Sequence, residues 1–299
     1  MCQSKHIQSA PFIVGVGRSG TTLLRLMLDS HPHLSIPPET HFIRKLLNSS
    51  YSQCDENFFF NTVVSTRTWK DFGIEETELY NRLITIPEFS ISDGLRVFYT
   101  CYAEKNNKIL WGDKTPIYLS NMTEIQRILP ESFFIHIIRD GRDSAISYRG
   151  LWFGPGNSVL AHAKMWSDRI YEGRMQAKNL NRKYFEIRYE RLVAEPEKVL
   201  KEICDLLALN YCDDMLNYHL SAKDRISQMQ SRISAKGEYI AKERIHNMFD
   251  LTSTPPDKRR IGRWRKEMSR EELMLYESEA GPLLHNLGYE TNFPELWKK

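Results

Sequence analysis

The residues best suited to chemistry lie in one short stretch, between an apolar run and an apolar helical pattern. This stretch holds a cation, three hydroxyl groups and three closely spaced glycines: Gly15, Gly17, Arg18, Ser19, Gly20, Thr21 and Thr22. Glycine lets the backbone approach a phosphate or sulfate closely, and the free N–H groups at a helix start bind anions. Arg18 adds a fixed positive charge, and the hydroxyl groups add donors. The stretch therefore predicts a site for a phosphorylated ligand.

Two elements must position this loop. The apolar residues 12–16 predict a buried strand, and the pattern at 23–30 predicts a helix, which Pro32 stops. The run 132–138 is the strongest strand prediction in the chain. Its almost continuous apolar character is typical of a parallel strand covered on both faces. It leads into the charged turn 139–143, which enters a second helix.

The rest of the chain alternates strands with helices. We predict strands at 108–116, where Asp113 and Lys114 lie near the end, and at 184–190. The other predicted helices are 42–47, 75–84, 92–104, 118–129, 159–179, 195–207 and 269–287. This alternation predicts an α/β fold with a mainly parallel central sheet.

We expect the whole chain, 1–299, to form a single domain, because no linker separates two parts. Residues 49–107 are rich in aromatic side chains, and we interpret them as an insertion that shapes the acceptor pocket. Residues 221–260 are polar and basic. They form either a solvated helical face or a lid that orders over an anionic ligand.

Three kinds of phosphate loop match parts of the glycine-rich stretch. The glycines fit the dinucleotide pattern, and Glu39 lies about where its ribose-binding acid belongs, but Glu39 follows two prolines instead of ending a second strand. The nucleotide-kinase loop requires Gly-Lys-Ser/Thr, whereas this chain has Gly20-Thr21-Thr22. Both interpretations are therefore disfavoured.

The third interpretation is a resemblance to a known family. Residues 18–22, Arg-Ser-Gly-Thr-Thr, resemble the 5′-phosphosulfate loop of the sulfotransferases that use 3′-phosphoadenosine 5′-phosphosulfate (PAPS). Residues 137–147 resemble the family's 3′-phosphate motif, a strand that ends in Arg-Asp-x-Arg and runs into a helix serine. The succession 18–23, 27–32 and Glu39-Thr40 is most similar to the tyrosylprotein and carbohydrate branch.

This resemblance implies a three-layer α/β sandwich related to the P-loop nucleotide kinases, and transfer of a sulfuryl group from PAPS to a hydroxyl group. Glu39 falls on the catalytic base, Lys114 on the lysine that stabilises the transferring group, and Arg18 beside that group. The residues implied in cofactor binding are Arg18, Ser19, Gly20, Thr21, Thr22, Arg139, Ser147, Tyr189 and Arg263. Candidates for stacking on adenine are Trp111, Phe153 and Trp264.

Other roles remain open for several of these residues. Arg139 could pair with Asp140 or Asp143 instead of a phosphate. Two histidines are rival bases: His136 lies inside the apolar strand, which favours a core role, and His41 lies two residues beyond Glu39. As alternatives to a sulfotransferase, the chain could be an ATP-dependent small-molecule kinase or a non-catalytic nucleotide-binding protein.

The composition restricts the partners. A net charge of +3 is too small to indicate nucleic acid, and no His, Cys and Asp cluster has the spacing of metal ligands. The five scattered cysteines indicate reduced thiols. Neither a signal peptide nor an apolar span of ~20 residues is present, so we expect a cytoplasmic protein without a membrane span. The acceptor could be a small molecule, carbohydrate, lipid or peptide that carries a hydroxyl group.

Overall fold

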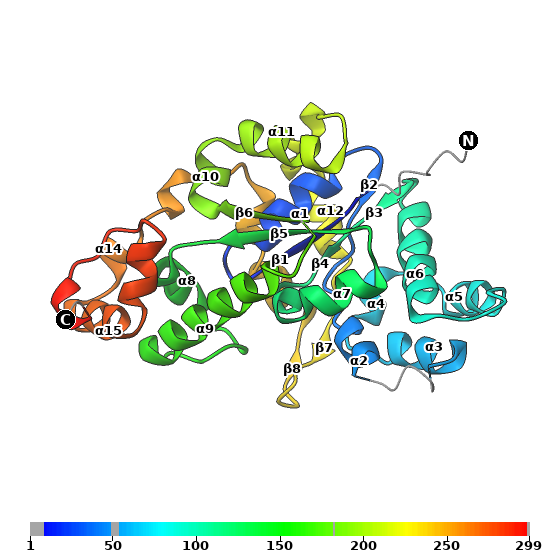
Figure 1. Ribbon diagram of the computed structural model, residues 1–299, viewed down its shortest axis with the longest axis horizontal. Helices are drawn as coiled ribbons and strands as arrows, with labels where there is room; N and C mark the ends of the chain where they lie inside the picture. Colours follow the sequence, from blue (N-terminus) through cyan, green and yellow to red (C-terminus); the bar gives the residue numbers. More distant parts are fainter. Residues whose placement is uncertain (1–8, 49–53, 182, 298–299) are drawn as a thin grey trace.

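A parallel sheet of four strands lies at the centre of the protein. The computed structural model describes residues 9–48, 54–181 and 183–297. The strand order is β4 (Asp113–Lys114), β1 (Ala10–Gly15), β5 (Ser132–Ile138) and β6 (Tyr184–Arg188), and each neighbouring pair is parallel (Figure 1). Because all four strands run the same way, the segments that follow them emerge at one edge of the sheet.

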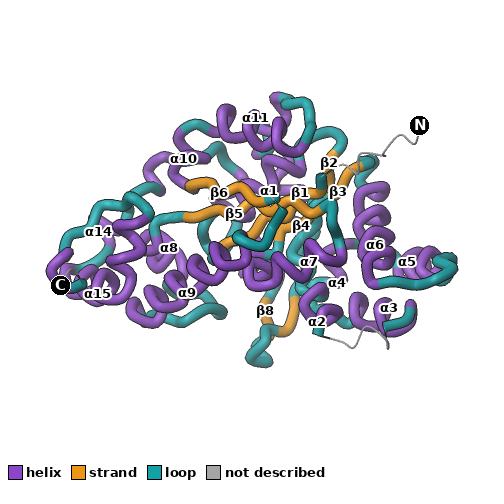
Figure 2. Tube along the Cα trace, viewed as in Figure 1, coloured by secondary structure: helices purple, strands orange, loops and turns teal. Residues whose placement is uncertain are grey.

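Side chains of the two central strands alternate between two apolar layers, as the period of a strand requires. In β1, Ile13 enters one layer, whereas Phe12 and Val14 enter the other. In β5, Ile135 and Phe134 divide in the same way. Helices cover both faces of the orange strands in Figure 2. The predicted three-layer α/β sandwich with a parallel sheet is thus confirmed.

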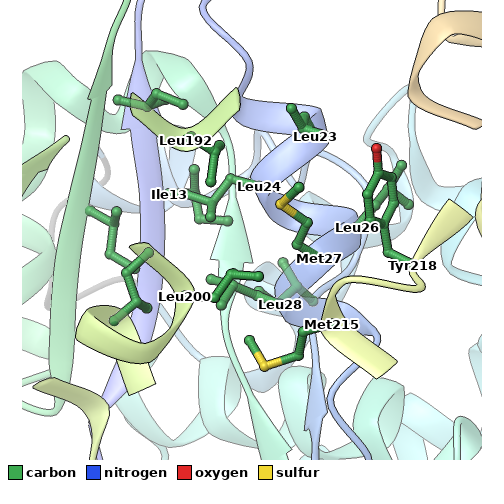
Figure 3. Close-up of a cluster of buried hydrophobic side chains, with 14 of the residues drawn as sticks. Ile13, Leu23, Leu24, Leu26, Met27, Leu28, Leu192, Leu200, Met215 and Tyr218 are labelled. Atoms are coloured by element: carbon green, nitrogen blue, oxygen red, sulfur yellow. The ribbon is translucent and has the colours of Figure 1, made fainter. Parts of the chain in front are cut away.

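One layer is built around helix α1 (Thr21–Asp29), which starts directly after the glycine-rich loop. Its apolar residues pack between the sheet and α10 (Tyr189–Ala194), α11 (Pro196–Leu207) and η3 (Asp213–Met215). Figure 3 shows Leu24 and Leu28 of α1 among Ile13, Leu200 and Met215. This packing fixes the helix start, and with it the loop, against the end of β1.

Residues 54–107 form part of the other layer. Their helices are α3 (Glu56–Val64), α4 (Trp69–Phe72), α5 (Glu76–Leu83) and α6 (Ile91–Lys105), next to α2 (Ile43–Leu47). Phe59, Phe98 and Tyr99 share a buried cluster with Phe12 of the sheet. The predicted insertion therefore contributes to the core, and its residues 49–53 lie outside the described part of the chain.

The remaining elements follow the predicted order with several differences. The strand predicted at 108–116 is divided into β3 (Leu110–Trp111), which pairs with β2 (Leu34–Ser35), and β4, which pairs with β1. Residues 116–121 form a 3₁₀ helix, η2, before α7 (Met122–Ile128), because Pro116 opens that segment. The strand β6 ends at Arg188, and Tyr189 already begins α10. The other elements are α8 (Gly141–Tyr148), α9 (Val159–Ala177), α12 (His219–Ser227), β7 (Arg232–Ile233), β8 (Tyr239–Ile240), α13 (Lys242–Asn247), η4 (Asp250–Ser253), η5 (Lys258–Arg260), α14 (Trp264–Glu267), α15 (Arg270–Asn286) and η6 (Pro294–Leu296).

None of the described helices is both long and apolar enough to cross a bilayer. Cys101, Cys204 and Cys212 form no disulfide among the described residues, and Cys2 lies outside the described residues.

A buried ionic network fixes the turn after β5. Arg142 donates to the Asp140 carboxylate at 2.8 and 3.1 Å and to Glu277 of α15 at 2.8 Å. Glu277 also accepts the backbone N–H groups of Asn292 and Phe293, at 2.7 and 2.9 Å. Arg142 and Glu277 are fully buried. The network thereby ties the C-terminal helix to the turn that carries Arg139.

We predict that Glu277→Ala lowers the free energy of unfolding by about 3–5 kcal/mol, because Arg142 would become a buried charge with only Asp140 to compensate it. Urea denaturation measures the change. Glu78→Ala is the control, since its pair with Arg82 is largely exposed and should contribute less than about 1 kcal/mol. Equal losses in the two variants would contradict the role of the network.

Candidate active site

The loop between β1 and α1 has the backbone of an anion cradle. Arg18 and Gly20 have positive φ angles of 62° and 95°, which turn the chain sharply before the helix. A side chain at Gly20 would meet the ring of Tyr189 at 2.4 Å, so only glycine fits there. The hydroxyl of Ser19 is fully buried and has no hydrogen-bond partner among the described residues. These features fit a bound oxyanion that is not part of the chain.

A cavity of about 550 Å³ opens beside this loop. Its size suits a small-molecule ligand. The predicted residues Arg18, Gly20, Thr21, Thr22, Arg139, Ser147 and Tyr189 line it. The opposite wall consists of residues 248–260, which belong to the basic segment 221–260. The structure therefore places part of that segment over the loop, and its action as a lid remains a prediction.

Charged side chains in the cavity wall are mainly cationic. They are Arg18, Arg139, Arg259 and Arg260, with Asp257 as the acid. Burial lowers the pKa of Arg18, and the neighbouring charges of Arg139 and Arg260 lower it as well. Asp257 is engaged by Arg259 at 3.0 Å. The wall thus carries excess positive charge, which favours an anionic ligand.

Arg139 is the residue predicted to bind a second anion. Its guanidinium donates to the backbone carbonyls of Arg18 at 3.1 Å and Arg260 at 2.8 Å, and to the Ser147 hydroxyl at 3.4 Å. It lies 4.4 Å from the centre of the Tyr189 ring, and its buried Nε has no hydrogen-bond partner among the described residues. The alternative partner Asp143 is 3.9 Å away and accepts instead from backbone N–H groups. The guanidinium is therefore only loosely neutralised.

Arg260 was not predicted as a binding residue, although it lies in the cavity wall. The signal was present in the basic run 258–260, which sequence analysis assigned only to a possible lid. Arg263, which was predicted, forms a two-point ion pair with Glu267 at 2.7 Å. It is not among the residues that line the cavity.

The two tryptophans predicted to stack on adenine, Trp111 and Trp264, do not line the cavity. Trp264 is 3% exposed and lies between the guanidinium groups of Arg142 and Arg265, at 3.6 and 4.4 Å. Trp111 is stacked on Tyr99, at 4.6 Å between ring centres. Both rings thus have aromatic or cationic partners within the chain, and their stacking on adenine stays a prediction. Phe153 contacts Tyr148 edge-on, and its role stays untested.

Glu39 and Lys114 meet beside the start of α1. The Glu39 carboxylate accepts from the Lys114 ammonium at 2.7 Å, and the same ammonium lies 3.4 Å from the Thr22 hydroxyl. The other carboxylate oxygen is 3.2 Å from His41. Burial acts to raise the pKa of Glu39, but Lys114 and His41 outweigh burial and hold the pKa well below its ordinary range. Glu39 is therefore an ionised, partly exposed carboxylate next to the anion loop.

The rival base His136 is fully buried in β5, and its Nδ1 lies 2.6 Å from the Tyr184 hydroxyl. Burial lowers its pKa to about 4. A side chain enclosed in this way cannot reach an acceptor, which agrees with the core role that its position in the strand favours. His41 remains near the site as a neighbour of Glu39.

A second carboxylate lies behind the ion pair. Asp113 is buried, and one oxygen accepts from the hydroxyls of Thr40 at 2.8 Å and Tyr99 at 2.9 Å. Burial raises its pKa to about 6, against the lowering effect of these hydroxyls. Sequence analysis singled out Asp113 only as a strand end. Its partners come from distant segments, so no local pattern could have indicated them.

Comparisons with known proteins indicate one family. A model of the sulfotransferase family matches residues 11–214. A putative protein-tyrosine sulfotransferase of Caenorhabditis briggsae is 25% identical over 292 residues, which cover 94% of this chain and 89% of the relative. Protein-tyrosine sulfotransferase 1 of Danio rerio is 23% identical over 288 residues, covering 93% and 72%. These relatives confirm the resemblance to the tyrosylprotein branch.

Among solved structures, a sulfotransferase domain from the curacin biosynthetic pathway superposes with a TM-score of 0.63. The two chains are 21% identical, and the match covers 96% of this chain and 99% of that domain. This likeness supports the fold.

We predict opposite pH dependences for two buried aspartates. The raised pKa of Asp113 means that its contribution to stability is present below pH ~4 and is lost as the pH rises through about 6. Substituting Asn removes this ionisation. The free energy of unfolding of the wild type should therefore fall relative to Asp113→Asn between pH 4 and pH 7, with a limiting slope of about 1.4 kcal/mol per pH unit.

Asp29 is the matched control, because Arg225 and Lys108 outweigh burial and lower its pKa. Its contribution is present above pH ~4 and is lost at lower pH, so Asp29→Asn should show the opposite slope. Denaturation series at several pH values measure both differences. Parallel curves for the wild type and Asp113→Asn would contradict the raised pKa of Asp113.

Proposed function

The chain belongs to the sulfotransferase family, and from this premise we propose that it transfers the sulfuryl group of PAPS to an acceptor hydroxyl, with Glu39 as the general base. The observation that carries the proposal is the position of the Glu39 carboxylate, 2.7 Å from the Lys114 ammonium and beside the first turn of α1. A proton acceptor and a cation thus meet where the loop would present the reacting group.

PAPS fits the cavity in two ways. Its negative charge complements the cationic wall, and buried polar groups there lack hydrogen-bond partners among the described residues. The loop N–H groups and the Ser19 hydroxyl would hold the 5′-phosphosulfate, and Arg139 with Ser147 would hold the 3′-phosphate. Ser19 Oγ, Arg18 Nε and Arg139 Nε are buried polar atoms without partners among the described residues. Buried donors of this kind are normally satisfied, so a ligand with many oxygens would supply what the chain does not. Arg260 joins this set from the opposite wall.

The reaction needs a proton acceptor and charge neutralisation. The acceptor oxygen forms a bond to sulfur while the bond from sulfur to the 5′-phosphate oxygen breaks, and 3′,5′-bisphosphoadenosine (PAP) leaves. The proton of the acceptor hydroxyl passes to Glu39, a step worth about 10²–10⁴-fold in rate. Lys114 and Arg18 stabilise the negative charge that develops on the transferring group and the leaving phosphate.

The ion pair also controls how strong a base Glu39 is. In the structure Lys114 lowers the pKa of the Glu39 carboxyl, which keeps this group ionised but weakly basic. A bound phosphosulfate would bring further negative charge to Lys114 and weaken its hold on Glu39. Donor binding would therefore raise the basicity of the carboxylate at the moment when the acceptor must be deprotonated.

The acceptor is proposed only as a hydroxyl group on a small molecule, carbohydrate, lipid or peptide. The relatives named for protein tyrosine make a tyrosine peptide the first probe. Residues 49–107 remain our proposal for shaping the acceptor pocket, and 221–260 for the lid. A cytoplasmic location also stays a prediction.

We predict that Glu39→Gln lowers turnover by about 10²–10⁴-fold, because an amide cannot take the acceptor proton. Binding of PAP should stay within about twofold, since Glu39 does not line the donor cavity. Turnover is measured as labelled sulfate moved from PAPS to a tyrosine peptide, a monosaccharide or 4-nitrophenol, and binding by calorimetry. Glu197→Gln, on the exposed start of α11, is the control. Near-normal turnover of Glu39→Gln would remove Glu39 from the role of base.

We predict that Arg139→Ala weakens PAP binding by at least about tenfold, through the loss of a charge-assisted contact with the 3′-phosphate. Adenosine 5′-phosphate lacks that phosphate, so its affinity should change much less in the same variant. The wild type should prefer PAP over ATP with Mg²⁺ in calorimetry. Equal losses for PAP and adenosine 5′-phosphate would contradict the 3′-phosphate site, and tighter binding of ATP would favour a kinase.

A further inference from the structure

Glu39 lies in a segment without regular secondary structure. Residues 36–42 connect β2 to α2 without belonging to a strand or helix. His41 has a φ angle of 57°, which is rare for a residue with a side chain. Strained backbone of this kind persists only where the surrounding structure fixes it. The position of the Glu39 carboxylate must therefore be set by contacts from elsewhere in the fold.

Those contacts are made by the next residue, Thr40. Its backbone N–H donates to the Thr115 hydroxyl at 3.0 Å, and its own hydroxyl donates to Asp113 at 2.8 Å. Tyr118 lies 2.8 Å from the same hydroxyl and accepts the backbone N–H of Ile43 at 3.0 Å. The segment that carries Glu39 is thus tied to residues 113–118 on the C-terminal side of Glu39, at Thr40 and at Ile43.

The Asp113 carboxylate determines which group donates in each of these hydrogen bonds. An ionised Asp113 only accepts, so the hydroxyls of Thr40 and Tyr99 donate to it, and Tyr118 in turn donates to Thr40. Thr40, Tyr99, Asp113 and Tyr118 form a hydrogen-bonded cluster. Because each of these side chains is fully or almost fully buried, water does not compete for their hydrogen bonds. The cluster therefore allows few other arrangements of Thr40.

The same cluster is anchored to the sheet and to Lys114. Asp113 precedes Lys114 in β4, and the two residues pair with Phe12 and Ile13 of β1. A bond from Thr40 to Asp113 therefore fixes the residue after Glu39 to the residue before Lys114. The side chains of Glu39 and Lys114 meet at 2.7 Å. Each is positioned by its neighbour in the chain, Thr40 or Asp113, and these two neighbours belong to one hydrogen-bonded cluster.

We propose that Thr40 and Asp113 are positioning residues that hold Glu39 against Lys114 and in line with the transferring group. This inference rests on the proposed role of Glu39 as the base. It assigns to the cluster an effect on turnover, beyond its contribution to stability. A displacement of about 1 Å at a reacting group can lower a rate by about 10²-fold, so a small shift of Glu39 is sufficient.

Thr40→Val tests the proposal, because valine keeps the shape of threonine and removes the hydroxyl. The assay follows release of PAP from PAPS, with 4-nitrophenol as the acceptor and with water alone. We expect kcat with 4-nitrophenol to fall by about 10- to 100-fold while the Kd for PAP stays within about twofold. Thr40→Ser keeps the hydroxyl and should restore most of the activity.

Thr123→Val is the matched control. Thr123 of α7 is half-buried, its hydroxyl donates to the Gln176 side chain at 2.5 Å, and it does not line the donor cavity. It should lose stability on heating in the same way as Thr40→Val and keep the wild-type kcat. If Thr40→Val does not fold, Tyr118→Phe replaces it, because that change removes one bond to Thr40 and should lower kcat by several-fold.

An independent measurement needs no acceptor. In carbon-13 NMR titrations, the Glu39 carboxyl should have a higher pKa in the Thr40→Val variant than in the wild type, because it would no longer be held beside Lys114. An unchanged kcat together with an unchanged Glu39 titration would overturn the positioning role. If Glu39→Gln abolishes turnover in that case, only the positioning role of Thr40 and Asp113 fails. If Glu39→Gln stays active, the proposed base itself fails.

Discussion

The contact between a buried ammonium and a carboxylate is the constraint on which the site depends. Lys114 is 1% exposed, and an isolated buried charge costs several kcal/mol, so the fold must bring an anion to it. That anion is Glu39, which lies 75 residues earlier in the chain. The requirement accounts for the short strand β4 beside β1 and for the rigid approach through Pro37 and Pro38. The core on both sides of the sheet holds these segments in place.

The donor cavity shows the opposite situation, in which positive charges are left without anions. Arg18, Arg139 and Arg260 lie close enough to affect one another electrostatically, and Arg18 and Arg139 donate mainly to backbone carbonyls. Carbonyls satisfy the N–H groups but do not neutralise the charge. This excess charge favours the binding of an anionic ligand.

How much the sequence predicted depends on how local each feature is. The loop at 15–22, the strand 132–138 and the helix after each follow from apolar periods and glycine spacing, and they were placed correctly. Tyr189 was placed in a strand but begins a helix, because helix packing against Arg139 and Gly20 decides that boundary. Trp264 was a candidate for stacking on adenine. Only the fold shows that it fills the space between Arg142 and Arg265. The partners of Thr40 lie more than 70 residues away, which no local pattern reveals.

Two carboxylates near the reacting group differ because their neighbours differ. Glu39 faces a lysine and a histidine, which hold its pKa low, whereas Asp113 faces hydroxyls, and burial raises its pKa to about 6. Environments that separate two pKa values in this way separate the roles of the groups. Glu39 is partly exposed and can meet an acceptor, but Asp113 is enclosed and can act only on its neighbours. In our proposal, one carboxylate takes the proton and the other holds the first in position, and the residues Thr40 and Lys114 connect the two.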